Sequence, residues 1–316
     1  MTNIVFRVVD IAEEAPDIRT LRMVRADGQA LKPYPAGSHI DVVGPTGVLR
    51  QYSLCMPPDD PESILIAVKR EPRSRGGSAA IHEVQVGDHL KVSKPRNLLA
   101  VADDADQHVL VAGGIGITPM LSMAYDLHSR GAEFELHYFA RSREEAAFVD
   151  LLESRAEFRD RVRIHLGVPR ARHPEVLATI MPRLTARSHV YTCGPQGFMD
   201  LVVATFTDKV GEAQVHIENF VAADVDTSGD RAFTVELDTG ETFQVPADRS
   251  ILGVLEDNGV DVFKSCEEGV CGSCVSGLLE GTVDHRDNCL TTTDRDTQLA
   301  LCVSRATSDR LLIELY

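Results

Sequence analysis

The stretch Cys266-Glu267-Glu268-Gly269-Val270-Cys271-Gly272-Ser273-Cys274 sets three cysteines at the spacing C-x4-C-x2-C, and Cys302 follows after 27 further residues. Four thiolates can hold a 2Fe–2S cluster, and a close triplet with a distant fourth cysteine is one of its ligand spacings. Such a loop wraps closely around two irons. Gly269 and Gly272 give the backbone that freedom and let amides approach the sulfurs. The sequence therefore predicts metal ligands at Cys266, Cys271, Cys274 and Cys302.

Two other uses of these cysteines fit less well. A structural zinc site needs a repeated C-x2-C or a His pair at ligand spacing. The next thiol after Cys274 is Cys289, and no Cys or His follows it at the spacing of a second knuckle. A disulfide framework is not expected in a chain of 316 residues without a secretory signal. Cys55 and Cys289 are expected to be small apolar fillers.

Length and composition describe an ordinary globular chain of two or three domains, 43% hydrophobic and 25% charged. No run approaches the roughly 18 apolar residues that a membrane span needs. A cytoplasmic protein without membrane association is expected, in a compartment that keeps thiols reduced. The net charge of −16 argues against nucleic acid as a partner. Residues 229–316, which hold the cysteine motif, carry 7 Lys and Arg against 17 Asp and Glu.

The first domain is expected at 1–102. Short runs of β-branched and aliphatic residues alternate there with Pro- and Gly-rich turns, and a short helix is expected at 78–84. Many short strands at regular spacing predict an antiparallel β-barrel. The strands are expected at 3–10, 18–24, 39–43, 48–54 and 63–69.

The second domain is expected at 103–222, where strands alternate with helices and so predict an α/β fold with a parallel sheet. The strands are expected at 107–112, 133–139, 161–166 and 188–192, and the helices at 119–128, 144–153 and 198–207.

A glycine loop follows the first of these strands. Gly114-Ile115-Gly116 begins like a dinucleotide fingerprint, but Pro119 stands where the third glycine belongs. Thr118 can cap the following helix, and the glycines let a phosphate approach the backbone. Taken alone, the loop is a tight strand-to-helix turn. Cys193-Gly194-Pro195, however, ends a later strand at the same sheet edge, where ligands of open α/β sheets bind.

Residues 223–231 have little large apolar content and are expected to be a linker to a third domain at 232–316. That domain has strand patterns at 232–237, 242–245, 281–284 and 311–315, with a helix at 250–258. The metal loop follows the helix. This order predicts a β-grasp domain of the plant-type ferredoxin kind.

A resemblance to the ferredoxin-reductase superfamily begins at Arg50-Gln51-Tyr52-Ser53. Such a tetrapeptide alone is an ordinary strand with a polar face. R-x-Y-S with a later R-G-G-S turn, however, is similar to the flavin domain of that superfamily. The resemblance implies that Arg50 contacts the flavin phosphate, that Tyr52 lies along the ribityl chain and ring, and that Ser53 hydrogen-bonds near N5. The implied site is completed by Lys69, Arg75, Gly76, Gly77 and Ser78.

The G-G-x-G-x-T-P loop and the later C-G-P resemble the NAD(P) half of the same superfamily. The resemblance places Thr118 and Cys193 near the nicotinamide, and Arg141 and Ser142 near the adenosine ribose. Gly114, Gly116, Gly194 and Pro195 are implied as further dinucleotide contacts. It also implies an aromatic residue stacked on the flavin. Phe220 is the candidate, and a position in the core is the other reading.

The order flavin barrel, NAD domain, ferredoxin domain resembles the phthalate dioxygenase reductase family, which includes vanillate demethylase reductases. The resemblance implies FMN, NADH and a 2Fe–2S cluster in a monomer that passes electrons to a Rieske-type oxygenase of the aromatic-ring dioxygenase or O-demethylase type. Hydride transfer needs no acid–base residue. Two alternatives remain open: a reductase for a cytochrome P450, and a non-catalytic, metal-stabilised binding module. Arg141 and Arg143 suit the 2′-phosphate of NADPH, whereas the resemblance favours NADH.

Overall fold

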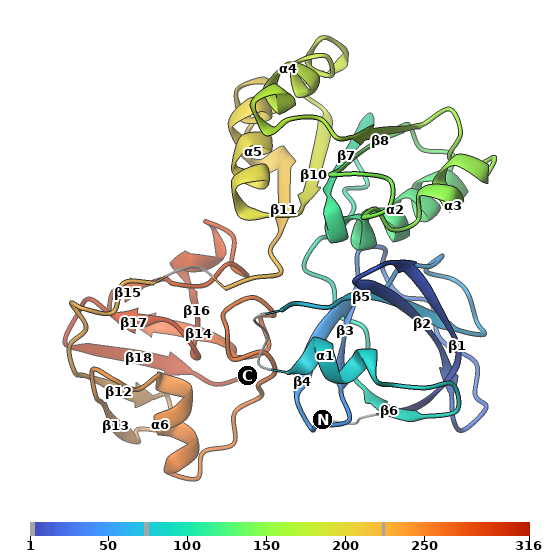
Figure 1. Ribbon diagram of the computed structural model, residues 1–316. Helices are drawn as coiled ribbons and strands as arrows, with labels where there is room; N and C mark the ends of the chain where they lie inside the picture. The colour runs from blue at the N-terminus through green and yellow to red at the C-terminus, as the bar shows by residue number, and fades with distance from the viewer. Residues whose placement is uncertain (1–3, 73–75, 223–224) are drawn as a thin grey trace. The chain divides into compact units, whose positions relative to one another are not determined.

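The structure is a computed structural model that describes residues 4–72, 76–222 and 225–316. The chain divides into two compact units after Glu218 (Figure 1). The first unit holds an antiparallel sheet and a parallel sheet, and the second holds the cysteine motif. The expected boundaries at 102, 222 and 231 stay predictions; residues 223 and 224 of the expected linker lie outside the described residues.

The antiparallel sheet of the first unit has six strands in the order β4-β3-β6-β1-β2-β5. Its two outer strands meet where Leu54 pairs with Ile66 and the Cys55 amide donates to the Leu65 carbonyl at 3.0 Å. The sheet therefore closes on itself, and the predicted β-barrel is confirmed. Its elements are β1 (Ile4–Ala15), β2 (Ile18–Arg25), β3 (His39–Val43), β4 (Leu49–Ser53), β5 (Ile64–Lys69), α1 (Gly77–His82) and β6 (His89–Val92).

The parallel sheet has the order β11-β10-β7-β8-β9. Helices α2 and α3 pack on one face, and α4 and α5 pack on the other (Figure 1). Since β7 is buried on both faces, its sequence is apolar. The parallel sheet that was predicted from the alternation of strands and helices is confirmed. The elements are β7 (Gln107–Gly113), α2 (Ile117–Ser129), β8 (Phe134–Ala140), α3 (Val149–Ser154), β9 (Val162–Leu166), α4 (His173–Ala178), β10 (Ser188–Cys193), α5 (Gln196–Val210) and β11 (Val215–Glu218).

Two expectations in this sheet were wrong. Thr118 does not cap α2: a 3-10 turn over Gly114–Gly116 leads directly into the helix, and the Thr118 hydroxyl donates to the Ile115 carbonyl at 3.0 Å. The helix expected at 144–153 is formed only over Val149–Ser154. It begins after Phe148, which is buried in the left-handed conformation (φ 63°), so the chain before it turns instead of continuing a helix.

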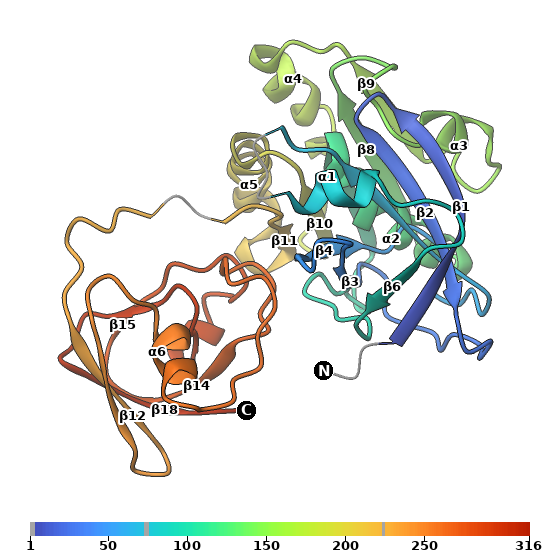
Figure 2. The same ribbon diagram turned by 60° about the horizontal axis from the view of Figure 1, so that its bottom comes forward.

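The second unit is a β-grasp fold, as predicted. Its sheet has the order β13-β12-β18-β14-β16, and α6 lies across one face (Figure 2). The Ser250 hydroxyl caps α6 by accepting the Gly253 amide at 3.1 Å. The elements are β12 (Phe233–Leu237), β13 (Thr242–Val245), α6 (Ile251–Asp257), β14 (Val275–Glu280), β15 (Val283–Asp284), β16 (Gln298–Ala300), β17 (Arg305–Ala306) and β18 (Arg310–Glu314). In the described ranges, no helix combines the length and apolar character needed to cross a bilayer.

Candidate functional site

The four predicted metal ligands lie together as two buried thiol pairs in the second unit. A hydrogen bond between the Cys266 and Cys271 thiols raises the pKa of Cys266 and lowers that of Cys271. A second one, between Cys274 and Cys302, raises the pKa of Cys302 and lowers that of Cys274. In the described part of the chain, no three His, Cys, Asp or Glu side chains are arranged for a single metal ion. Two pairs fit a cluster of two irons, each bound by two thiolates.

The backbone of the metal loop is turned so that its amides point at the sulfurs. Glu267, Gly269 and Gly272 all have positive φ, at 58°, 72° and 68°. The Glu268 amide donates to Cys266 Sγ at 3.3 Å, and the Ser273 amide to Cys271 Sγ at 3.5 Å. Successive amides of this kind form a concave site for an anion, which suits the negative charge of a thiolate cluster.

Cys289 lies beside these thiols but is paired with none of them. Burial raises the pKa of its thiol, and the neighbouring Asp287 carboxylate adds to the effect. Its Sγ lies 3.7 Å from Asp287 Oδ2, and its side chain packs against the core of this unit. Its position agrees with the expected role of an apolar filler.

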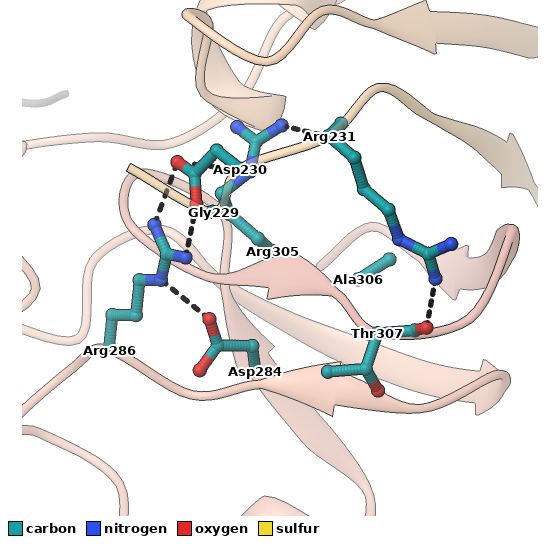
Figure 3. A pocket seen from close by; sticks show the side chains of 8 residues that line it. All are labelled: Gly229, Asp230, Arg231, Asp284, Arg286, Arg305, Ala306 and Thr307. Atoms are coloured by element: carbon teal, nitrogen blue, oxygen red, sulfur yellow. Dashed lines mark hydrogen bonds and ion pairs between the residues drawn. The ribbon is translucent and has the colours of Figure 1, made fainter. Parts of the chain in front are cut away.

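A hollow of about 300 Å³ lies in the same unit, and Figure 3 shows Asp230 between Arg286 and Arg305 in it. Arg286 binds Asp230 through two hydrogen bonds of 2.5 and 3.0 Å and Asp284 through one of 2.7 Å. Arg305 is buried and donates to the carbonyls of Arg249, Arg231 and Pro246 at 2.7 to 3.0 Å. The charged groups of the described residues that line the hollow are paired with one another or with backbone carbonyls. These contacts hold the chain at Asp230, and they leave no charge in the hollow to bind a ligand.

In the barrel, Arg50 reaches the glycine turn that begins α1. A Cβ placed on Gly77 would lie 2.9 Å from Arg50 Cγ and 3.2 Å from its Nε, so any larger residue here would displace the Arg50 side chain. The Ser78 hydroxyl accepts the Glu71 amide at 3.1 Å, and Lys69 pairs with the Glu71 carboxylate at 3.1 Å. Gly76 precedes α1 with φ 92°. Arg75, another predicted flavin contact, lies outside the described residues.

Tyr52 and Ser53 end β4 with buried hydroxyl oxygens that have no hydrogen-bond partner among the residues that the structure describes. Burial raises the pKa of Tyr52 to about 12. Buried hydroxyls normally find partners, and each one that does not has an energetic cost of about 1–3 kcal/mol. These two oxygens therefore fit a ligand with acceptor and donor atoms, as a flavin has.

At the carboxyl edge of the parallel sheet, the glycine loop and the C-G-P turn are packed backbone against backbone. A Cβ on Gly116 would lie 2.2 Å from the carbonyl oxygen of Cys193 and 2.8 Å from the amide nitrogen of Gly194. Thr118 and Cys193 are buried beside this contact. Gly114 has φ 56° with open space around it, and Pro195 packs against Gly113. The structure thus brings together the residues predicted around the nicotinamide.

The remaining predicted residues lie further out. Arg141 and Ser142 follow β8 directly, at the same carboxyl edge, and the Arg141 side chain is 79% exposed. Phe220 belongs to the second unit and is 39% exposed, so it is not a core residue. Its stacking on a flavin stays a prediction.

Two buried polar residues that the sequence analysis missed, His39 and Glu218, lie beside predicted site residues. His39 Nδ1 is 4.0 Å from Glu218 Oε1. Within the described ranges, neither ring nitrogen of His39 has a hydrogen-bond partner, and Glu218 Oε2 has none either. His39 lies opposite Ser53 in the barrel, and Glu218 lies beside Cys193 in the parallel sheet. Burial raises the pKa of Glu218 to about 8 and lowers that of His39 to about 4. The one signal of this pair in the sequence was that Glu218 is a carboxylate at the end of β11.

Comparison with known proteins extends this picture. Residues 235–307 match the family model of the 2Fe–2S iron-sulfur cluster binding domain. Vanillate O-demethylase oxidoreductase of Pseudomonas putida is 42% identical over 98% of both chains. The solved structure of phthalate dioxygenase reductase, a modular structure for electron transfer from pyridine nucleotides to a 2Fe–2S cluster, is 39% identical with a TM-score of 0.73, over 99% of this chain and 98% of that one.

A third similarity is to part of a larger protein. An intact type IV self-sufficient cytochrome P450 monooxygenase matches 98% of this chain with 41% of its own length, at 36% identity and a TM-score of 0.86. The full-length matches are to separate oxidoreductases instead. The chain therefore belongs to the family of phthalate dioxygenase reductases and vanillate O-demethylase oxidoreductases.

Proposed function

We propose that this chain is the reductase component of a two-component Rieske-type oxygenase, taking electrons from NADH and delivering them through FMN and a 2Fe–2S cluster. The observation that carries the proposal is the buried set of four thiols in two pairs, on a β-grasp domain that continues from a unit with a barrel and a parallel sheet. The full-length relatives that serve oxygenases and demethylases support it.

The cluster ligands in this proposal are Cys266, Cys271, Cys274 and Cys302. The chain's contribution is to keep them buried, to hold them in pairs, and to direct amides at their sulfurs. Hydrogen bonds to the sulfurs and exclusion of water set the reduction potential of such a centre.

The flavin residues in this proposal are Arg50, Tyr52, Ser53, Lys69, Gly76, Gly77 and Ser78, together with Arg75. When bound, a flavin accepts a hydride from a nicotinamide and releases electrons one at a time. Arg50, fixed against Gly77, supplies the guanidinium for the phosphate. Helix α1 has only six residues, so Arg50 outweighs the helix dipole here. Ser53 and Tyr52 have buried hydroxyls without a partner in the described part of the chain, and these can orient the ring and ribityl chain.

The nicotinamide site in this proposal lies between Thr118, Cys193 and the packed glycine loop. Its residues orient the ring and exclude water, and hydride transfer needs no acid–base group from the chain. Gly114 leaves the backbone open to the dinucleotide, whereas Gly116 and Gly194 let the two loops pack together beside it. Pro195 is a further contact, and Arg141 and Ser142 border the adenosine ribose. Phe220 is proposed to stack on the flavin.

The electron acceptor proposed is a Rieske-type oxygenase. A cytochrome P450 is the second candidate, because a self-sufficient P450 contains a region similar to this whole chain. We further propose a monomer in the cytoplasm, since free thiolate ligands need a reducing compartment.

The test uses the purified full-length protein. It should be coloured by flavin and iron–sulfur bands, release FMN on acid extraction, contain two irons per chain, and reduce a Rieske oxygenase purified with it in the presence of NADH. A colourless protein would overturn the proposal as a whole. FAD in the extract would overturn the flavin assignment alone, and transfer only to a P450 would favour the second candidate. Light scattering checks the monomer.

A further inference from the structure

Arg143 lies just beyond β8, and its guanidinium pairs with two carboxylates. Its Nη2 lies 2.5 Å from Asp150 Oδ1 and 2.7 Å from Glu153 Oε2, and its Nη1 lies 3.1 Å from Glu153 Oε1. Both acids belong to α3, the short helix that follows. The guanidinium is thus bound on both sides by α3.

The two residues before Arg143 are engaged in the same way. The Ser142 hydroxyl hydrogen-bonds the Glu144 carboxyl and lowers its pKa. Arg141 Nη1 lies 3.7 Å from Glu145 Oε2. Each residue of Arg141-Ser142-Arg143 that suits a phosphate therefore contacts an acid from within the next ten residues.

The sheet order places residues 141–143 where the adenosine ribose of a bound dinucleotide is expected. Strands β10, β7 and β8 are neighbours and parallel, so their carboxyl ends line one edge. With the nicotinamide at Cys193 on β10 and the phosphates over the glycine loop after β7, the ribose lies beyond β8. The 2′ position, which separates NADH from NADPH, then faces residues 141–143.

Charge decides between the two dinucleotides at this place. Residues 141–153 carry two arginines and four carboxylates. A phosphate monoester carries a charge of about −1.5 to −2 at pH 7. It would have to displace Asp150 and Glu153 from Arg143 and remain beside them, whereas a neutral 2′-hydroxyl leaves the ion pairs intact. Repulsion between the 2′-phosphate and these carboxylates weakens the binding of NADPH, whereas NADH has no charge at this position and is little affected.

We propose that Asp150 and Glu153 act as specificity residues by withholding Arg143 from a 2′-phosphate, so that the chain selects NADH against NADPH. The proposal rests on the proposed function, because it assumes a pyridine dinucleotide at this edge. On this proposal, Arg143 could bind a 2′-phosphate but does not, because its guanidinium is paired with the two carboxylates of α3. We call Arg143 the latent phosphate ligand.

The test variant is the double substitution Asp150→Asn with Glu153→Gln in the full-length holoprotein. These side chains are 93% and 49% exposed, so the fold is retained. The matched control is Asp103→Asn with Glu133→Gln. It removes the same charge beside two other exposed pairs, Asp103–Arg130 and Glu133–Arg161, at the opposite edge of the sheet. Adding Arg143→Ala to the test variant removes the latent ligand.

Two measurements are needed at fixed ionic strength. The first is kcat/KM for NADPH and NADH with ferricyanide as acceptor. The second is calorimetric binding of 2′,5′-ADP and 5′-AMP, which differ by the 2′-phosphate and need no turnover. We expect the test variant to gain about tenfold for NADPH and for 2′,5′-ADP, the worth of about 1.4 kcal/mol, with NADH and 5′-AMP within about twofold. Arg143→Ala should abolish the gain, and the control should show none.

An equal gain in the control, a gain that survives Arg143→Ala, or no gain at all overturns the proposal. A native protein that prefers NADPH also overturns it but leaves the reductase function standing. A protein that oxidises neither dinucleotide contradicts the proposed function, and calorimetry then still decides whether Asp150 and Glu153 exclude the 2′-phosphate. Absence of binding by both nucleotides refutes both proposals.

Discussion

Replacing Gly116 with alanine should drive apart the two loops that form the nicotinamide edge. The new Cβ would lie 2.2 Å from the Cys193 carbonyl oxygen, 2.4 Å from its carbon and 2.8 Å from the Gly194 nitrogen. These are backbone atoms at the end of β10, which is held between β7 and β11. No side-chain rotation relieves the overlap, so one loop has to move by about 1 Å.

Overpacking of this kind costs about 1–3 kcal/mol, and a backbone obstacle places Gly116→Ala at the upper end. The φ of −63° at Gly116 suits alanine, so conformational strain adds nothing. Alanine returns about 0.5–1 kcal/mol by restricting the unfolded chain, which leaves a net loss of about 2 kcal/mol. For a unit of this size, about 2–4 °C per kcal/mol lowers Tm by about 4–8 °C.

Thermal unfolding followed by circular dichroism measures this loss, and Gly197→Ala is the matched control. Gly197 lies in α5, and nothing outside its own helix would lie within 4 Å of a Cβ placed there, so alanine should be neutral or slightly stabilising. Displacement of the loop should also lower kcat/KM for NADH by about 100-fold, since a 1 Å misplacement has that effect on reacting groups. A Gly116→Ala protein that melts within about 1 °C of the native one would refute this reading of the backbone contact.

The remaining predictions concern the thiols and the buried carboxyl. Cys302→Ser should lower the iron content below two per chain while FMN stays bound, and Cys289→Ser should leave two; iron analysis showing loss in the Cys289 variant would contradict the ligand assignment. Because the pKa of Glu218 is raised to about 8 from 4.5, its stabilising effect is complete below about pH 4.5 and is lost as pH rises through 8, by up to about 5 kcal/mol. Glu218→Gln should flatten that dependence in urea unfolding at pH 6 and 8.5, and an unchanged slope would show that another group titrates.

The sequence predicted best what is decided locally. The cysteine triplet lies within nine residues, and its two glycines adopt the positive φ that was expected of them. The apolar run at 107–112 predicted a strand, which the structure forms as β7. Strands β6, β11, β14, β16 and β17 were missed because their sequences mix apolar and polar residues; their pairing with other strands of the sheets creates them.

The sequence failed where packing between distant segments decides. His39 lies in β3 of the barrel and Glu218 in β11 of the parallel sheet. Nothing in the sequence around either residue indicates that the two side chains meet. The shortened α3 depends on Phe148, whose left-handed backbone is compensated by burial of the ring and by an amide that donates to Glu14 of β1 at 3.1 Å. A propensity argument sees none of these contacts.

The segment Arg286–Asn288 has a mechanical consequence. Arg286 holds Asp230, and the Asn288 side chain donates to the Val221 carbonyl at 3.3 Å, so two points near the start of the second unit are fastened to one short stretch. The same stretch reaches the metal loop, because the Asn288 amide donates to the Gly269 carbonyl at 2.8 Å. A displacement at Asp230 or Val221 can therefore reach the amides around the sulfurs through a few hydrogen bonds within this unit, without passing through its hydrophobic core.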